Sequence, residues 1–317
     1  MRHIFPFFFL IVCLFGTLKV KAKEREHFID PSLQRGVALL APRPVKGVGV
    51  KIDTLRFCKN QESPIWRLCS WDYGTFFSGN QSSHTEYGIG YANDAFLIAR
   101  DNEGIITMRV NASNVYKSHR SVSSQPWINF LLETEYDSLI LANATKATLS
   151  YEMRVLSCRN RMGDAYNTNI HAAQFLAYLY VRNINKESED YQKSLWLGVG
   201  MYDNRCVTGT LDSSITSWDI GTNTYIFNPK GENVFGKKRN LTDHKWHKVT
   251  VDIRKIIDEA IHSLNSNGYL KASKVDDYAI CYMNIGWEVP GTFDVVGQFR
   301  DISITSNAES TEVKPSK

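Results

Sequence analysis

Apolar and polar residues alternate along most of the chain in short runs that Gly, Asn, Asp and Pro interrupt. Successive side chains of a β-strand point to opposite faces, so this pattern is typical of strands with one buried and one exposed face. The pattern predicts strands at Val48–Phe57, Trp66–Phe77, Ala95–Arg100, Ile105–Val110, Ile128–Tyr136, Ala147–Leu156, Ala173–Arg182, Leu195–Tyr202, Thr222–Phe227, Trp246–Ile253, Tyr278–Trp287 and Val295–Thr305.

One segment has helical spacing instead. Its apolar residues are Ile253, Ile256, Ile257, Ala260, Ile261 and Leu264, which predict an amphipathic helix of about three turns that ends near Asn267-Gly268. Because strands and helices do not alternate, we expect a mainly β fold, an antiparallel two-sheet jelly-roll sandwich with this one short helix. We expect a single domain over residues 23–306 and a disordered tail over residues 307–317.

The first 22 residues are typical of a secretory signal peptide. Arg2 and His3 precede an uncharged apolar run from Ile4 to Gly16, and Val20 and Ala22 suit the positions before a cleavage site. The run is shorter than the ~20 residues that cross a bilayer, so we expect a secreted protein without an integral membrane segment. Cys13 raises a lipoprotein alternative, which its place inside the apolar run disfavours.

The net charge and the cysteine count further limit the expected partners and disulfide bonds. Cleavage would remove Arg2, Lys19 and Lys21 and lower the net charge from +4 to +1, which gives no reason to expect nucleic acid as a partner. Five cysteines remain outside the signal, and an odd number in an exported chain leaves at least one free thiol. Cys58 and Cys69 flank a short segment with Pro64, and we expect a disulfide bond between them.

The outward faces of several strands collect aromatic and polar side chains. In the strands at 173–182 and 195–204 the apolar set Ala173, Phe175, Ala177, Leu179, Val181, Leu195, Leu197, Val199 and Met201 should face the core. The opposite faces would then present, with neighbouring strands, the residues Tyr178, Tyr180, Arg182, Trp196, Tyr202, Asn204, Tyr282, Glu152 and Arg154. Gly198 and Gly200 would leave a trough between Trp196 and Tyr202.

Sugar rings carry apolar C–H patches beside hydroxyl groups, so aromatic plates with planar hydrogen-bonding groups suit a glycan site. The same residues are also normal on a half-buried sheet face, where they pair across strands. His171, before a strand, could be a general base, with Arg154 and Glu152 as partners, or a structural histidine. The chain has no phosphate-binding loop, no G-x-S-x-G turn and no H-E-x-x-H motif.

Three stretches resemble secreted jelly-roll modules of carbohydrate-active proteins, meaning carbohydrate-binding modules and concanavalin-A-like lectins, glucanases and lyases. They are ATLSYEMRV at 147–155, HKWHKVTVDI at 244–253 and GQFRDISIT at 297–305, within about the last 160 residues. The E-x-D-x-x-E strand of such glucanases is missing, which disfavours that activity. In calcium-bearing modules an acidic residue stands where Asp301 stands here, so the resemblance implies a structural calcium ion as the one cofactor to consider.

These observations lead to two hypotheses with polysaccharide as the partner. The first is a secreted carbohydrate-binding protein that uses Trp196, Tyr178, Tyr180, Tyr202 and Tyr282 as plates. The alternative is a polysaccharide lyase or glycoside hydrolase on the same scaffold, with His171, Arg154 and Glu152 as catalytic groups. A domain that binds a protein through its aromatic face is a third possibility. The test between the first two is product formation from a polysaccharide panel.

Overall fold

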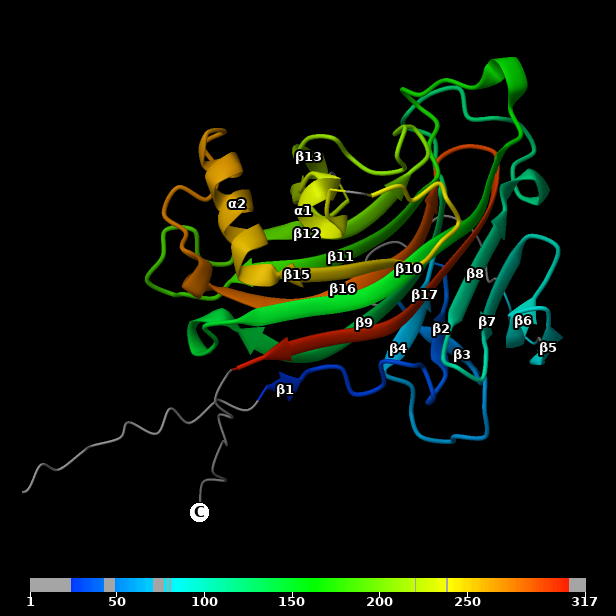
Figure 1. The fold of residues 1–317 in the computed structure, drawn as a ribbon, viewed down its shortest axis with the longest axis horizontal. Coiled ribbons are helices and arrows are strands. Elements are labelled where there is room, and N and C mark those ends of the chain that lie inside the picture. Colours follow the sequence, from blue (N-terminus) through cyan, green and yellow to red (C-terminus); the bar gives the residue numbers. More distant parts are fainter. Residues whose placement is uncertain are drawn as a thin grey trace, which may run out of the picture.

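The fold is described from a computed structural model, which places residues 24–42, 49–70, 77, 79, 81–219, 221–237 and 239–307, without the side chains of residues 135–138. The strands of this described part form two large sheets, sheet A with eight strands and sheet B with nine, which pack face to face as a β-sandwich (Figure 1). The mainly β, two-sheet architecture expected from the alternation is therefore present.

The sheets have the following spatial orders. Sheet A consists of β15 (His247–Asp252), β10 (Ala147–Asn160), β17 (Phe293–Ser306), β8 (Ile106–Asn111), β7 (Phe96–Arg100), β6 (Gly88–Ala92) and β5 (Ser83–Thr85), with β1 (Arg25–Glu26) paired to β17. Sheet B consists of β13 (Ile215–Asp219), β14 (Thr224–Asn228), β12 (Ser194–Asp203), β11 (Gln174–Asn183), β16 (Tyr278–Val289), β9 (Ile128–Ile140), β4 (Trp66–Cys69), β2 (Val37–Leu40) and β3 (Lys51–Leu55).

The strand pairing differs from the prediction in two places. β12 pairs with β14 in parallel, and β2 pairs with β4 in parallel, while the other pairs are antiparallel. The expectation of a purely antiparallel sandwich is therefore wrong. Alternation along a strand reports which face is buried and contains no information about the direction of the neighbouring strand.

The predicted helix is α2 (Ile253–Asn265), whose buried residues are the six apolar positions of the helical pattern. It begins where the Asp252 carboxylate accepts a hydrogen bond from the Arg254 backbone N–H, 3.1 Å away. A second, unpredicted helix, α1 (Gly231–Phe235), lies beside it against β12 and β15 (Figure 1). Short 3-10 turns occupy Ala112–Asn114, Leu141–Asn143, Gly163–Ala165 and Val275–Asp277.

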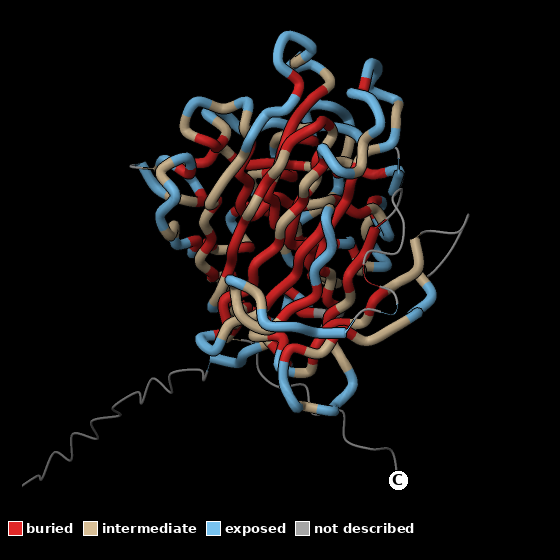
Figure 2. Tube along the Cα trace, turned by 90° about the vertical axis from the view of Figure 1, so that its right-hand side faces the viewer, coloured by how far each residue is buried: buried red, intermediate tan, exposed pale blue. Residues whose placement is uncertain are grey.

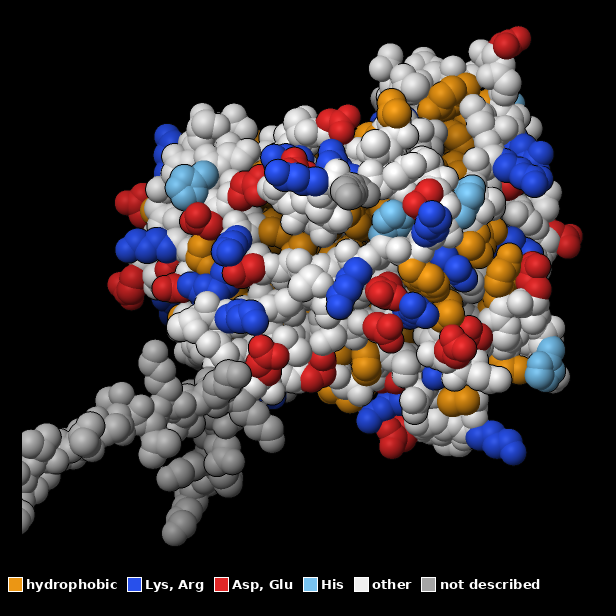
Figure 3. Space-filling view, viewed as in Figure 1, with side chains coloured by type: hydrophobic (Ala, Val, Ile, Leu, Met, Phe, Trp, Pro, Cys, Tyr) orange, Lys and Arg blue, Asp and Glu red, His pale blue; other side chains and the backbone are white. Residues whose placement is uncertain are grey.

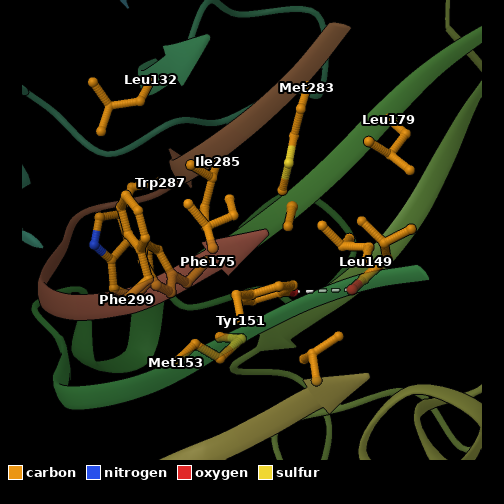
Figure 4. Packing of buried hydrophobic residues seen from close by; sticks show 14 of the residues in the cluster. Leu132, Leu149, Tyr151, Met153, Phe175, Leu179, Met283, Ile285, Trp287 and Phe299 are labelled. Carbon is orange, nitrogen blue, oxygen red and sulfur yellow. Dashed lines mark hydrogen bonds between the residues drawn. The ribbon is translucent and has the colours of Figure 1, made fainter. Parts of the chain in front are cut away.

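The core lies between the sheets. Figure 4 shows Trp287 and Phe175 of sheet B beside Phe299 and Tyr151 of sheet A, and the Phe175 and Trp287 ring centroids are 4.9 Å apart. The Trp287 indole N–H donates to the Met108 carbonyl at 3.0 Å, so its polar atom is satisfied inside the core. Buried strand segments fill the middle of the molecule, and exposed loops join them at both ends (Figure 2).

Several predictions concern the ends of the chain. The signal peptide at residues 1–22 lies outside the described residues, so secretion stays a prediction, as do the domain boundaries. Asn307, assigned above to a disordered tail, is held by the Lys146 backbone N–H, which donates to its side-chain oxygen at 2.8 Å. Residues 308–317 lie outside the described residues. None of the helices that the structure describes is long and apolar enough to span a bilayer.

Candidate functional site

Four of the predicted aromatic residues form one cluster on the outer face of sheet B. Tyr178 and Tyr180 come from β11, Trp196 from β12 and Tyr282 from β16, and all four side chains are half-buried. The Tyr180 and Tyr282 rings stack with centroids 4.6 Å apart. Trp196 meets Tyr180 at 5.1 Å and Tyr282 at 5.4 Å, edge to face. We call these four residues the aromatic cluster.

Polar groups fix the rings of the aromatic cluster. The Trp196 indole N–H donates to the Thr222 hydroxyl at 3.0 Å, and that hydroxyl donates to the Asp219 carboxylate. The Tyr180 hydroxyl donates to the Ser194 hydroxyl at 2.8 Å. Arg182, on the same strand face as Tyr180, is exposed. The cluster is therefore a set of oriented rings with polar groups at its border, and this part of the sequence prediction is consistent with the structure.

The middle of the same face is apolar and covered. Leu131, Leu176 and Met201 are each at most 6% exposed and pack together with Tyr178 and Leu211. Burial raises the pKa of the Tyr178 hydroxyl, and the nearby carboxylates of Glu288, Asp203 and Asp219 add to the shift. Leu211 belongs to the connection between β12 and β13, so this connection closes the centre of the face.

Beyond this covered region, a hollow of about 200 Å³ lies at the other end of the face. Its lining includes Glu288, Trp127, Gln174, Arg120 and Arg205. Burial raises the pKa of the Glu288 carboxyl from 4.5 to about 7, and the charge of Asp219 adds a smaller increase. The nearby Trp127 indole N–H lowers the pKa of Glu288 and so opposes this increase. The same indole N–H is buried and makes no hydrogen bond with any described residue.

Asp203 lies on the same face as Glu288, with Gln174 paired in register to both. Its carboxylate is 1% exposed and accepts hydrogen bonds from Gln174 Nε2 at 2.8 Å and from Arg205 Nη2 at 2.6 Å. Asp203 is thus neutralised by Arg205, whereas the described residues offer Glu288 no cation within ion-pair distance. The raised pKa of the Glu288 carboxyl allows this group to carry a proton near neutral pH.

Met201 and Tyr202 of β12 lie on the opposite faces from those predicted. Tyr202 is 5% exposed and belongs to the main core, where its ring meets Trp287 at 6.3 Å, and Met201 takes its place on the outer face. The prediction of Tyr202 as a binding residue is therefore wrong. The cause is a register shift between Leu176 and Tyr178, opposite Gly200, whose φ is +143°. A bulge of this kind shifts the alternation of the strand by one residue.

The predicted trough at Gly198 and Gly200 is also absent. A Cβ on Gly198 would lie 2.2 Å from Asn228 Oδ1, and a Cβ on Gly200 would lie 2.0 Å from the Tyr151 hydroxyl. Protein atoms therefore already fill the space that these glycines leave.

Asn204 and His171 hold loops together. Asn204 Oδ1 accepts from the Ala173 N–H at 2.6 Å, and its Nδ2 donates to the Tyr166 hydroxyl at 3.0 Å. His171 is 1% exposed, accepts at Nδ1 from the Asn167 N–H at 3.0 Å and lies with Nε2 2.8 Å from the Arg120 carbonyl. His171 is buried and both of its ring nitrogens are engaged, which favours the structural alternative for this histidine over a general base.

Glu152 and Arg154 lie on the other side of the molecule. They belong to β10 of sheet A, and their side chains are on its outer face, so they do not meet the aromatic cluster. Glu152 accepts from Arg300 Nε at 2.7 Å, and Arg154 Nε donates to Gln298 Oε1 at 2.6 Å. Their proposed roles beside His171 or as clamps for the aromatic plates are therefore wrong.

Asp301 and the cysteines also differ from expectation. Asp301 is exposed, 3.6 Å from Arg300 Nε, and the described residues contain no group of three His, Cys, Asp or Glu side chains that could hold a metal ion. Cys58 and Cys69 are both free thiols, and the predicted disulfide between them is absent.

Sequence reasoning missed Glu288 and Trp127 as site residues. Glu288 lies between the buried residues Trp287 and Val289 of β16 and therefore on the outer face, but nothing local to this strand shows that Trp127 lies beside it. A glutamate two positions after Gly286 in a strand of apolar inward residues was the only available signal.

Comparisons with known proteins give a structural likeness alone. No family model matches the chain, and no curated protein matches it. An endoglucanase Cel12A from Rhodothermus marinus is 10% identical, covers 67% of this chain and 86% of its own, and has a TM-score of 0.35. A family 12 xyloglucanase from Bacillus licheniformis is 10% identical over 71% of this chain and 97% of its own, with a TM-score of 0.39.

A family 11 xylanase from Neocallimastix patriciarum is likewise 10% identical over 73% of this chain and 97% of its own, with a TM-score of 0.31. The solved structures that resemble this chain thus include endoglucanases, xyloglucanases and xylanases. The overlap is partial, so any chemistry has to come from the residues of this chain.

Proposed function

We propose that the protein binds a polysaccharide on the outer face of sheet B, with the aromatic cluster as the platform. The observation that carries this proposal is the set of four half-buried rings, in which Tyr180, Trp196 and Tyr282 contact one another and Tyr178 contacts Trp196. Arg182, Asp219 and Thr222 border this set. An amphipathic ring offers an apolar surface to sugar C–H groups, and the border offers hydrogen-bond partners to the hydroxyls. Preoriented rings lose little conformational entropy when a ligand binds.

The test is binding of the purified protein to a panel of neutral polysaccharides by affinity electrophoresis and calorimetry. Trp196→Ala should weaken binding about tenfold or more, since it removes a whole aromatic contact. Trp218→Ala is the matched control, because Trp218 is 45% exposed and belongs to a separate group with Tyr225 and Tyr269. Unchanged binding in Trp196→Ala, with the fold intact, would exclude this platform.

Hydrolysis of the bound polysaccharide is the second candidate function, and Glu288 favours it over binding alone. A carboxyl group with a pKa of about 7 is protonated in part at neutral pH, as the general acid of glycoside hydrolysis must be. The hollow around it leaves room for a substituent, and Trp127 and Gln174 border it. In this function Glu288 would protonate the leaving oxygen as the glycosidic bond breaks. A water molecule would bond to the anomeric carbon and release its proton to the solvent.

Release of reducing ends from the polysaccharide panel tests the hydrolase candidate. Glu288→Gln should lower the rate by roughly 10²–10⁴-fold, which is the usual contribution of a general acid. Glu187→Gln, an exposed carboxylate on a loop, is the control and should leave the rate unchanged. If binding is found and no reducing ends appear from any polymer, the protein is a binding module.

Secretion is a separate proposal, which does not depend on the sugar-binding face. We propose export on the basis of the segment at residues 1–22, and mass spectrometry of the secreted protein, which should begin at Lys23, would test it.

A further inference from the structure

The outer face of sheet A, opposite the aromatic cluster, bears a group of arginines that the proposed function does not use. Met153 and Val155 of β10 are buried, so Arg154 between them points outward, and Arg159 follows on the same strand and is exposed. Arg109 points outward from β8 between Met108 and Val110. At about 3.3 Å per residue, Arg154 and Arg159 are about 16 Å apart along β10.

Arg154 is held in a fixed orientation. Its guanidinium carbon lies 4.4 Å from the centroid of the Trp246 ring, and that of Arg300 lies at the same distance from this ring. Arg154 Nε donates to Gln298 Oε1 at 2.6 Å, and Gln298 is itself 4% exposed and donates to the Thr107 hydroxyl at 2.8 Å. Stacking and this hydrogen bond preorganise the guanidinium, whose terminal N–H groups have no acceptor among the described residues.

The charges on this face do not cancel. Glu152 pairs with Arg300 at 2.6 Å, and Asp294 pairs with Arg161 at 2.6 Å. In the part of the chain that the structure describes, Arg109, Arg154 and Arg159 have no carboxylate within ion-pair distance. Burial and the neighbouring Arg300 lower the pKa of Arg154, and the more distant Asp101 offsets this only in part. A bound anion would relieve this excess of positive charge.

A polar hollow of about 350 Å³ continues the same face at the far end of β10. Its lining includes Arg159, Arg161, Ser113, Asn114 and Asn111, with the paired Asp294. The Ser113 hydroxyl donates to Asp294, and the Asn111 and Asn114 amides each donate one N–H to the Asp94 carbonyl. The hollow therefore offers an oxyanion the Arg159 guanidinium and the second N–H of each amide. Arg154 and this hollow are two anchor points on one strand.

We propose that Arg154, Arg159 and Arg109 form a second binding site, which takes the carboxylate or sulfate groups of an acidic polysaccharide. Two separated anchor points fit a polymer with repeated anionic groups better than a single small ion. Glu152, Asp294 and Asp301 lie among the arginines, so a densely charged polyphosphate such as nucleic acid would meet repulsion on the same face. A sugar polymer with at most one charge per ring tolerates these carboxylates.

The test is binding of polygalacturonate, chondroitin sulfate, neutral dextran and duplex DNA to the full protein, with intrinsic tryptophan fluorescence as a second readout. The wild-type protein should bind at least one of the two acidic polysaccharides and should not bind dextran. The double variant R154Q/R159Q should weaken that binding about tenfold or more, since each removed charged hydrogen bond typically accounts for that much. R154K keeps the charge and loses the planar guanidinium, so its affinity should lie between those of the wild-type protein and the double variant.

The control K51Q/K186Q removes two exposed lysines elsewhere and should bind as the wild-type protein does. Thermal unfolding of each variant shows whether it is folded, and R159Q alone changes only an exposed side chain. Three results would overturn the proposal: no binding to either acidic polymer, equal loss in the lysine control, or DNA binding as tight as polygalacturonate binding. Trp196→Ala should leave this binding unchanged, so failure of this site and failure of the aromatic cluster are distinguishable.

Discussion

The hydroxyl of Tyr151 in sheet A donates a hydrogen bond to the Val199 carbonyl in sheet B, 2.9 Å away across the core (Figure 4). Val199 and Gly200 lie at the bulge of β12, where the register with β11 shifts. Neither residue has a partner on β11. The bond therefore satisfies a buried carbonyl that the ladder does not use. It also fixes the point at which the alternation of β12 reverses.

Tyr151→Phe should lower the free energy of unfolding by about 1–2 kcal/mol, because the buried Val199 carbonyl loses its donor.

Gly200→Ala should lower the free energy of unfolding by about 2 kcal/mol or more, because the new Cβ would lie 2.0 Å from the Tyr151 hydroxyl. Urea unfolding of both variants measures these changes.

The double variant Tyr151→Phe/Gly200→Ala should cost less than the sum of the two single changes. Without the hydroxyl, the nearest Tyr151 atom to the new Cβ is the ring carbon at 3.2 Å, so much of the clash disappears. Strict additivity would show that the two residues do not interact at this bulge.

Glu288→Gln should flatten the dependence of stability on pH. The folded pKa of Glu288, about 7, lies above the unfolded value near 4.5, so the folded protein binds more protons than the unfolded chain between these values. Its contribution to stability is complete below pH 4.5 and is lost as the pH rises through 7, by up to about 3 kcal/mol. Chemical unfolding of both proteins at pH 5 and pH 8 tests this, and an identical pH slope would argue against a buried Glu288.

Thiol labelling should separate the cysteines by burial. Cys58 is exposed and should react with a disulfide reagent in the native protein. Cys69 is buried and Cys158 has its pKa raised to about 11 by burial, so both should react only on unfolding. Cys58→Ser should remove the fast phase. A native protein in which Cys58 does not label until a reductant is added would instead contain the Cys58–Cys69 bridge.

Glu152→Gln should destabilise the outer face of sheet A by about 0.5–1 kcal/mol, the usual range for a partly exposed ion pair. The change leaves Arg154 and Arg300 on one indole with only the exposed Asp301, 3.6 Å from Arg300 Nε, as a carboxylate partner among the described residues. The loss should be larger at low salt, where the repulsion between the two cations is less screened. Urea unfolding at two ionic strengths measures it, and Glu187→Gln is the control.

Alternation along the sequence was sufficient to assign many side chains to a face. Phe175, Ala177 and Leu179 are buried and Tyr178 and Tyr180 point outward, as predicted. The same rule failed after Gly200, because the bulge adds one residue without any mark in the sequence beyond the glycine. Period-two reasoning is therefore valid only up to the first irregularity of a strand.

The alternation pattern could not predict which residues meet in the candidate site, because it does not show which strands become neighbours. Arg154 was correctly assigned to an outer face, but this face belongs to sheet A and not to the sheet of Trp196. Which strands become neighbours depends on contacts between residues far apart in the chain, such as β10 with β17. Glu288 shows the same dependence, since Trp127, which lines the hollow beside it, belongs to a segment more than a hundred residues earlier.

The pairing of β1 with β17 brings the first and last strands together, with Arg25 opposite Ser306 (Figure 1). Neighbouring strands are about 5 Å apart, so a short glycine linker could join residues 24 and 307 without disturbing either sheet. The chain could then be opened at exposed residues such as 221–223, between β13 and β14, which would give a circular permutant of the same sandwich.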